Sequence, residues 1–186
     1  MANFVKAYIK LTQAEFGNKP DQFLHLNAGE NGYTLGGIYQ KANPEAFDWI
    51  FIEGVLALCE FNLERASVML YHDPITKERV FNFFKKYYWD TALLDSVQSQ
   101  VQAENIFLSG VHIGVRNAVK LAQKVVQVQQ DGIIGQYSIK ALNYYDDNMF
   151  KRHFDKLELE NYNNLIEKNP NLEWARQGFE NRVYAV

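Results

Sequence analysis

Three dipeptides that end in proline divide the chain, and apolar residues recur at helical spacing between them. Asn43-Pro44, Asp73-Pro74 and Asn169-Pro170 each place a capping residue before a proline. Such a pair begins a helix or ends the one before it. Between the breaks, apolar residues fall three and four positions apart, whereas the alternation typical of strands is nearly absent. The chain is therefore predicted to be mostly α.

The helices expected from this pattern cover most of the chain. They span residues 3–16, 43–62, 75–89, 91–110, 115–126, 136–143, 146–168 and about 172–183. The helix from Pro44 to Asn62 is apolar on more than one face, so we expect it at the centre of the core. Residues 17–42 are instead predicted to form a loop rich in glycine and asparagine, and residues 131–135 a turn.

Composition excludes several classes of protein. A length of 186 residues fits one domain, or a domain with a small appendage, and 47% hydrophobic residues indicate a globular chain. A net charge of −3 gives no general attraction to nucleic acid or to an anionic membrane. The single cysteine, Cys59, cannot form an internal disulfide, and we interpret it as a buried apolar residue.

Neither a metal site nor a cofactor site is predicted. The four histidines, His25, His72, His112 and His153, lack the spacing of metal ligands. The N-terminal segment has no apolar stretch of signal-peptide type, and no segment is long enough to span a bilayer. We therefore expect synthesis in the cytoplasm, with any export depending on another component.

Glu15 is the residue best placed for catalysis. It precedes a glycine and is expected at the C-terminal end of its helix, where the dipole disfavours a carboxylate and should raise its pKa. A carboxyl group that keeps its proton near neutral pH can act as a general acid on a glycosidic bond. Position alone does not separate this role from that of a solvated surface glutamate.

A family resemblance favours the catalytic role. The segment AEFG, followed by GENGYTLGGI, resembles the opening motif of the secretion-activator type N-acetylmuramidases, glycoside hydrolase family 108. The resemblance places Glu15 on the catalytic glutamate, and Thr34 and Gly37-Ile38 on the motif T-x-x-G-I. This chain departs from the family at Phe16, which replaces a glycine, and at Gly29 and Asn31, which stand where the family has Asp and Gly.

Further motifs follow in the family's order. Tyr88-Trp89-Asp90 resembles a Y-W-D element, and residues 106–114 resemble a helix-end motif in which Leu108 replaces Asp and His112 replaces Asn. Residues 131–142 are similar to part of a peptidoglycan-binding segment. Argued from the residues alone, residues 131–135 form a structural turn, with wall binding as the alternative. Residues 169–182 fit the end of that segment.

The resemblance implies a fold, a reaction and a setting. It implies a lysozyme-like helical domain over residues 1–114 and an integrated peptidoglycan-binding-like helical segment over residues 115–186. The implied reaction is hydrolysis of the β-1,4 bond between N-acetylmuramic acid and N-acetylglucosamine in peptidoglycan glycan strands. The protein would act at the cell wall or periplasm, with a holin or a secretion system as a partner for export. A non-catalytic wall-binding or assembly protein is the alternative, favoured by the departures at Gly29, Leu108 and His112.

Candidate site residues follow from the motif and from the loop composition. Glu15 would be the general acid, Glu30 or Asp21 the second carboxylate, and Thr34 could instead hold a water or hydroxyl. The candidate substrate-binding residues are Asn27, Tyr33, Tyr39, Trp89 and His112. Tyr33 and Tyr39 could stack on sugar rings, whereas Trp89 is more typical of a core residue than of a sugar platform, and a buried or capping role is the alternative for His112.

Overall fold

The computed structural model describes residues 1–15, 17, 19–27 and 30–184, so Phe16 and Gly29 lie outside the described residues. The chain is mostly α, as predicted. The helices are α1 (Phe4–Glu15), α2 (Trp49–Leu58), α3 (Leu63–His72), α4 (Pro74–Phe84), α5 (Gln100–Ile113), α6 (Val115–Val125), α7 (Gln136–Tyr144), α8 (Asp147–Lys168) and α9 (Arg176–Tyr184). Short 3-10 or π-helical turns cover Pro20–Gln22, Lys85–Asp90, Leu94–Ser96 and Pro170–Ala175, and the strands are β1 (Leu24–His25), β2 (Thr34–Leu35) and β3 (Ile38–Tyr39).

The chain divides into two compact units. The first unit contains residues 1–10 and 86–186, and the second contains residues 11–85. The predicted boundary between residues 114 and 115 falls inside the first unit, between α5 and α6. A division into two sequence modules at that point stays a prediction.

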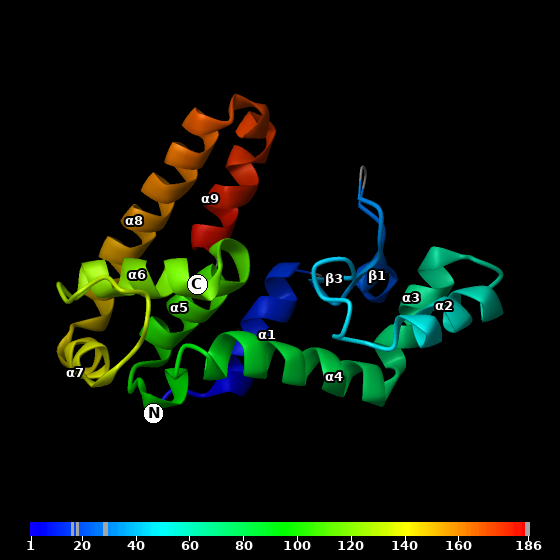
Figure 1. The fold of residues 1–186 in the computed structure, drawn as a ribbon, viewed down its shortest axis with the longest axis horizontal. Helices are drawn as coiled ribbons and strands as arrows, with labels where there is room; N and C mark the ends of the chain where they lie inside the picture. Colours follow the sequence, from blue (N-terminus) through cyan, green and yellow to red (C-terminus); the bar gives the residue numbers. More distant parts are fainter. Residues whose placement is uncertain (16, 18, 28–29, 185–186) are drawn as a thin grey trace. The chain divides into compact units, whose positions relative to one another are not determined.

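Helix α5 forms the centre of the first unit. Every residue from Gln102 to Gly110 is buried, and α6 and α8 pack against it. An aromatic cluster closes one side, with ring centroids of Phe4 and Trp89 5.5 Å apart and those of Trp89 and Phe107 5.8 Å apart. Figure 1 shows α8 and α9 side by side in this unit, as their packing requires.

The start of α5 differs from the sequence prediction. The helix was expected from Asp90 or Thr91, but it begins at Gln100, after Ser99 accepts a hydrogen bond from the Gln102 N–H at 3.2 Å. Leu93 has φ of 49°, a left-handed conformation that a continuous helix cannot contain. The apolar residues between 91 and 98 are therefore spaced for burial in short turns and not for a continuous helix.

The second unit is built on a small antiparallel sheet. Strand order is β1-β2-β3, with Leu24 opposite Leu35 and with Thr34 opposite Tyr39. The Ser67 hydroxyl of α3 accepts a hydrogen bond from the Leu24 N–H at 2.8 Å and donates one to the Pro20 carbonyl at 2.6 Å. One buried serine thus attaches the first strand and the preceding turn to α3.

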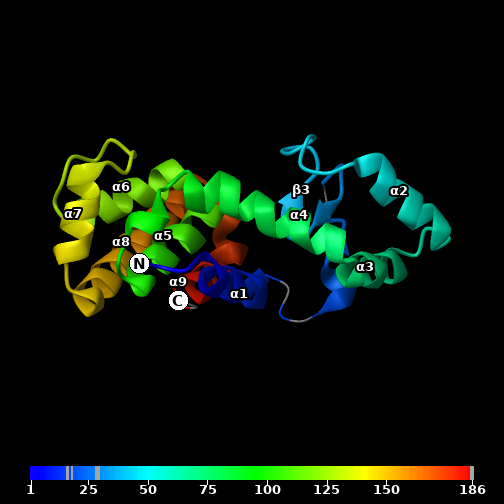
Figure 2. The ribbon, with the colours of Figure 1, turned by 90° about the horizontal axis from the view of Figure 1, so that it is seen from below.

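The helix expected over residues 43–62 is shorter than predicted, and α2 covers only Trp49–Leu58 of this range. Pro44 lies in a turn, and α2 begins at Trp49, where the Asp48 carboxylate accepts a hydrogen bond from the Phe51 N–H at 3.2 Å. Glu60 has φ of 54°, which ends α2, and a new helix starts after Asn62. Figure 2 shows α2 and α3 adjacent in this unit.

The expectation that this segment is central to the core is also wrong for one face of α2. Ile50 is 82% exposed and Leu58 is 77% exposed, whereas Ile52 and Leu56 are buried. The apolar residues on the outer face suggested burial all round, but α3 packs against one face of α2 and the opposite face stays exposed. Cys59, at the end of α2, is buried as predicted.

Two glycines of the second unit should respond oppositely to alanine. Gly36 has φ of 55°, and an added Cβ would lie 2.9 Å from the Phe23 ring. Gly54 lies in α2 with nothing within 4 Å of an added Cβ. We expect Gly36→Ala to destabilise by about 1–3 kcal/mol and Gly54→Ala to stabilise by up to about 1 kcal/mol. Urea denaturation measures both, and equal effects would contradict the backbone geometry.

Glu158 of α8 should make the stability of the first unit depend on pH. Its side chain is 5% exposed, and burial, with a smaller effect from the Asp155 carboxylate, raises its pKa to about 7. The folded chain then holds a proton that the unfolded chain releases above its ordinary pKa of 4.5. Stability should therefore fall as pH rises from about 4.5 to about 7, by about 3 kcal/mol for a shift of this size.

Glu158→Gln should remove that decline, because the amide has no charged form to bury. Thermal melting of both proteins across this pH range is the measurement, with the exposed Glu160→Gln as the matched control on the same helix. Parallel pH profiles for wild type and Glu158→Gln would show that Glu158 is not the responsible group.

Candidate functional site

A pocket of about 560 Å³ lies in the second unit, beside the Gly- and Asn-rich loop. The loop supplies one side and the start of α2 the other. It is lined by Leu26, Glu30, Asn31, Gly32, Tyr33, Gln40, Lys41, Pro44, Trp49 and Glu53. Its size is within the range of pockets that hold small ligands.

Two hydrogen bonds between Tyr33 and Gln40, one of them to a side chain, hold the loop wall in place. The Tyr33 N–H donates to Oε1 of Gln40 at 3.0 Å, and the Gln40 N–H donates to the Tyr33 carbonyl at 2.9 Å. These two bonds continue the pairing of β2 with β3 beyond Thr34 and Tyr39, so the Tyr33 side chain projects from a fixed backbone. On the facing side, Nε1 of Trp49 donates to the Asn43 carbonyl at 3.3 Å, which fixes the indole next to the turn.

The pocket combines charged and aromatic groups. Glu30, Glu53 and Lys41 line it together with Tyr33 and Trp49. Glu30 is oriented by Asn27, whose Nδ2 donates to Oε2 of Glu30 at 3.0 Å. Carboxylates that accept hydrogen bonds from hydroxyl groups, next to an aromatic ring, suit a polar ring-shaped ligand such as a sugar. The predicted residues Asn27, Glu30 and Tyr33 are thus brought together.

Glu53 was missed by the sequence prediction. It stands on α2 and reaches the same pocket as Glu30 from the opposite wall. The available signal was a lone carboxylate within the apolar run from Trp49 to Leu58. The pairing itself depends on how the loop folds over α2, which local sequence does not reveal.

The other predicted catalytic residues lie elsewhere in the second unit. Glu15 is the last residue of α1, as predicted, and is exposed. It is not among the residues that line this pocket, and neither are Asp21, Thr34 and Tyr39. The Thr34 hydroxyl oxygen is buried and has no hydrogen-bond partner among the described residues. A buried polar atom in that state is unusual and can receive a water or a ligand group.

Trp89 and His112 belong to the first unit. Trp89 is 0% exposed, and its Nε1 donates to Oδ1 of Asp95 at 2.7 Å, so the core alternative left open by the sequence is favoured over a sugar platform. Leu108, at a position where the resembled family has Asp, is also buried in α5. His112 is half-buried near the end of α5, and burial, together with the nearby Arg182, lowers its pKa to about 4.

The segment Asp131–Gly135 forms a turn held by one buried side chain. Nε2 of Gln123 donates to Oδ1 of Asp131 at 2.8 Å and to the Ile133 carbonyl at 3.0 Å. Oε1 of Gln123 accepts from the Gly132 N–H at 2.9 Å. The Gln123 hydrogen bond, the largest cause, and the Ile133 N–H hold the pKa of Asp131 below its usual value. These contacts account for the motif as structure.

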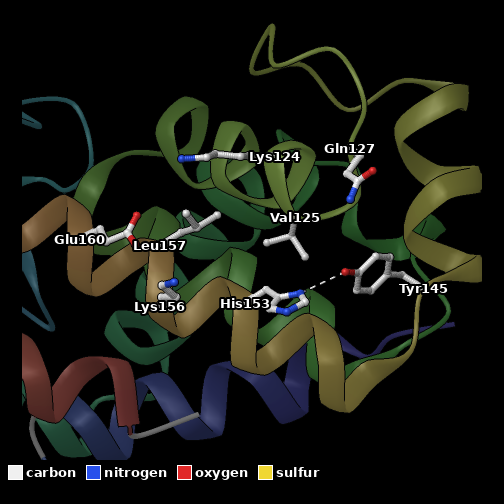
Figure 3. Close-up of a pocket in the computed structure, with 8 residues that line it drawn as sticks. All are labelled: Lys124, Val125, Gln127, Tyr145, His153, Lys156, Leu157 and Glu160. Carbon is white, nitrogen blue, oxygen red and sulfur yellow. Dashed lines mark hydrogen bonds between the residues drawn. The ribbon is translucent and has the colours of Figure 1, made fainter.

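A second, smaller pocket lies in the first unit between α6 and α8 (Figure 3). Val125 and Leu157 supply its apolar surface, and charged residues of both signs surround them. The Tyr145 hydroxyl and Nδ1 of His153 are hydrogen-bonded at 3.1 Å across one end. The mixed charge gives this pocket no clear ligand preference.

The described residues contain neither a cluster of metal-binding side chains nor a membrane-spanning helix. No group of three or more histidine, cysteine, aspartate or glutamate side chains is arranged to hold a metal ion. Within the same residues, none of the helices has the length and apolar character needed to cross a bilayer.

Comparison with known proteins identifies a shared fold. No family model and no curated protein matches the chain. Among solved structures, the chain is similar to SagA of Brucella abortus, with 20% identity, a TM-score of 0.64, and coverage of 97% of this chain and 88% of that one. At this identity the likeness shows the fold alone. It confirms a mostly α, lysozyme-like fold and supports the resemblance stated above at that level.

Tyr33 should contribute more than Tyr39 to binding of a glycan fragment. Tyr33 lines the pocket and Tyr39 does not, so only Tyr33→Ala removes an aromatic wall. By analogy with aromatic stacking on bases, we expect a loss of about 1–3 kcal/mol for Tyr33→Ala. The measurement is calorimetric titration with an N-acetylglucosamine oligomer, with melting temperature as the check on folding. Unchanged affinity in Tyr33→Ala, or a larger loss in Tyr39→Ala, would contradict the prediction that this pocket binds sugar.

Proposed function

We propose that the chain is a peptidoglycan hydrolase that cleaves the β-1,4 bond between N-acetylmuramic acid and N-acetylglucosamine. The observation that carries the proposal is Glu15, an exposed carboxyl at the end of α1 that immediately precedes the loop bearing the polar, aromatic-walled pocket. The order of this glutamate, the loop and Thr34 matches the resembled muramidase motif, and the fold shared with SagA is compatible with it.

In the proposed reaction Glu15 donates a proton to the leaving oxygen. A second carboxylate then stabilises the oxocarbenium-like transition state or activates water. Glu30 is the candidate that the loop composition suggested, and Glu53 joins it because both line the pocket. The buried Thr34 hydroxyl, which lacks a hydrogen-bond partner among the described residues, is suited to hold a water or a substrate hydroxyl.

The proposed setting is the cell wall or periplasm, after synthesis in the cytoplasm. Peptidoglycan glycan strands are the proposed substrate, and the proposal includes neither a cofactor nor a metal. Export by a holin or a secretion system stays a prediction from the sequence resemblance.

A non-catalytic wall-binding protein is the second candidate. Leu108 favours it, because the side chain that replaces a family Asp is apolar and only 4% exposed, so it cannot supply that carboxylate's chemistry. Such a protein would bind purified sacculi and sediment with them without reducing their turbidity. The hydrolase would reduce the turbidity.

Replacing Glu15 by glutamine should abolish measurable hydrolysis of sacculi. The amide keeps the size of the side chain but cannot donate the proton, and general acid catalysis contributes about 10²–10⁴-fold. Wild-type activity should also decline on the alkaline side as the acid deprotonates. Turbidity assays over a range of pH, with thermal melting to check folding, are the measurement.

Glu30→Gln and Glu53→Gln are the matched comparisons, since each removes one carboxylate from the same unit. The variant of the second catalytic carboxylate should lose activity, whereas the variant of a merely binding carboxylate should mainly raise KM. Full lysis by Glu15→Gln would exclude Glu15 as the general acid.

A further inference from the structure

A cleft of about 330 Å³ in the first unit has a different charge from the pockets described above. It lies where the end of α5 meets α6, α8 and α9. Its lining residues are His112, Ile113, Asn117, Asn161, Tyr162, Asn164, Leu165, Lys168, Phe179 and Arg182. None of these described lining residues is acidic, whereas the pocket of the second unit contains two carboxylates.

The positive charge of the cleft comes from Lys168 and Arg182. Both side chains are exposed, and neither forms an ion pair with another residue in the described part of the chain. His112 adds no charge near neutral pH, because burial and Arg182 lower its pKa to about 4. The cleft therefore has two cationic groups and a neutral imidazole.

The remaining walls are aromatic and amide groups. The rings of Tyr162 and Phe179 are stacked, 4.4 Å apart and 6° from parallel, and the Arg182 guanidinium lies 5.9 Å from the Phe179 ring centroid. Asn161 and Asn164 lie one turn apart on α8, and their amides make no hydrogen bond to other described residues. Amides and apolar side chains together match the backbone and side chains of a peptide.

Three helix ends meet at the cleft and affect the charge that it can accept. His112, Lys168 and Arg182 each stand in the last turn of its helix, where the backbone carbonyls carry partial negative charge. Cations in these positions also stabilise the helices themselves, which is the purely structural explanation for Lys168 and Arg182. That explanation accounts for the charges but not for the unused amides beside them. The partial negative charge opposes any bound anion, and a dianion such as phosphate more than a carboxylate, so binding of a carboxylate here depends on Lys168 and Arg182 outweighing it.

We propose that this cleft binds the terminal carboxylate of a short peptide, with Lys168 and Arg182 holding the carboxylate and with Asn161 and Asn164 contacting the peptide amides. The site is separate from the hydrolytic chemistry proposed for Glu15. It would let the first unit recognise peptide, either in a protein or in the peptide stems of a wall, while the second unit contacts glycan.

The test is titration of the full chain with N-acetyl-alanyl-alanine and with its C-terminal amide, followed by proton–nitrogen NMR. The L,L and D,D stereoisomers are compared, because proteins supply the first and bacterial walls the second. We expect the acid to shift the His112 ring signals and the backbone signals of α9, and the amide to bind at least about tenfold more weakly, as expected when a charge-assisted hydrogen bond is lost.

Arg182→Gln and Lys168→Gln should each weaken binding of the acid by about tenfold or more. Arg152→Gln is the control, since it removes one exposed cation from α8 outside the cleft and should leave affinity unchanged. Both cleft cations are exposed, so loss of their helix-end stabilisation should lower the melting temperature only slightly. Either variant suffices if the other fails to fold. Equal binding of acid and amide, equal losses in Arg152→Gln, or binding of inorganic phosphate but not of the acid would overturn the proposal.

Discussion

Burial of α5 is the constraint on which the first unit depends. A helix buried along most of its length must find partners for its polar side chains inside the protein. The Glu104 side chain is 5% exposed. Its carboxylate forms an ion pair with Lys10 of α1 at 2.6 Å and accepts a hydrogen bond from Nε2 of Gln100 at 2.7 Å. Nε2 of Gln102 donates to the Tyr145 carbonyl at 3.1 Å and to Asp147 at 3.0 Å. These bonds attach α5 to the start of the chain and to the junction before α8.

The two units use polar contacts differently. In the first unit, hydrogen bonds from a buried side chain, that of Gln123, fix the shape of an irregular turn that has no regular secondary structure. In the second unit, three very short strands and a single serine of α3 organise the loop, and the resulting wall carries the pocket. The hydrolytic site is proposed in the second unit, where few contacts constrain the loop and a ligand can therefore enter. Binding of a peptide carboxylate is proposed in the first unit, at the cleft where the ends of α5, α8 and α9 meet.

Local signals predicted most helices of this chain, because caps and apolar spacing act within one or two turns. Asp73 caps α4, as the sequence indicated, and the helix predicted to start at residue 146 is α8, capped by Asp146. The helix predicted over residues 43–62 was too long, because its apolar residues fit one continuous helix. Glu60 and Phe61, which follow the end of α2, have left-handed conformations that their ordinary side chains do not reveal. Loop composition likewise identified Glu30 and Tyr33. Glu53 joins them only through tertiary folding, which no local pattern encodes.

The turn after α2 gives the second unit an internal reporter. Cys59 is 7% exposed and is the single cysteine of the chain. A thiol reagent can reach its sulfur only when the end of α2 separates from its neighbours. The rate of labelling in native buffer therefore measures how often this part of the molecule opens, and its dependence on denaturant distinguishes a local opening from global unfolding. The wild-type chain thus allows the opening of the second unit to be timed without any introduced label site.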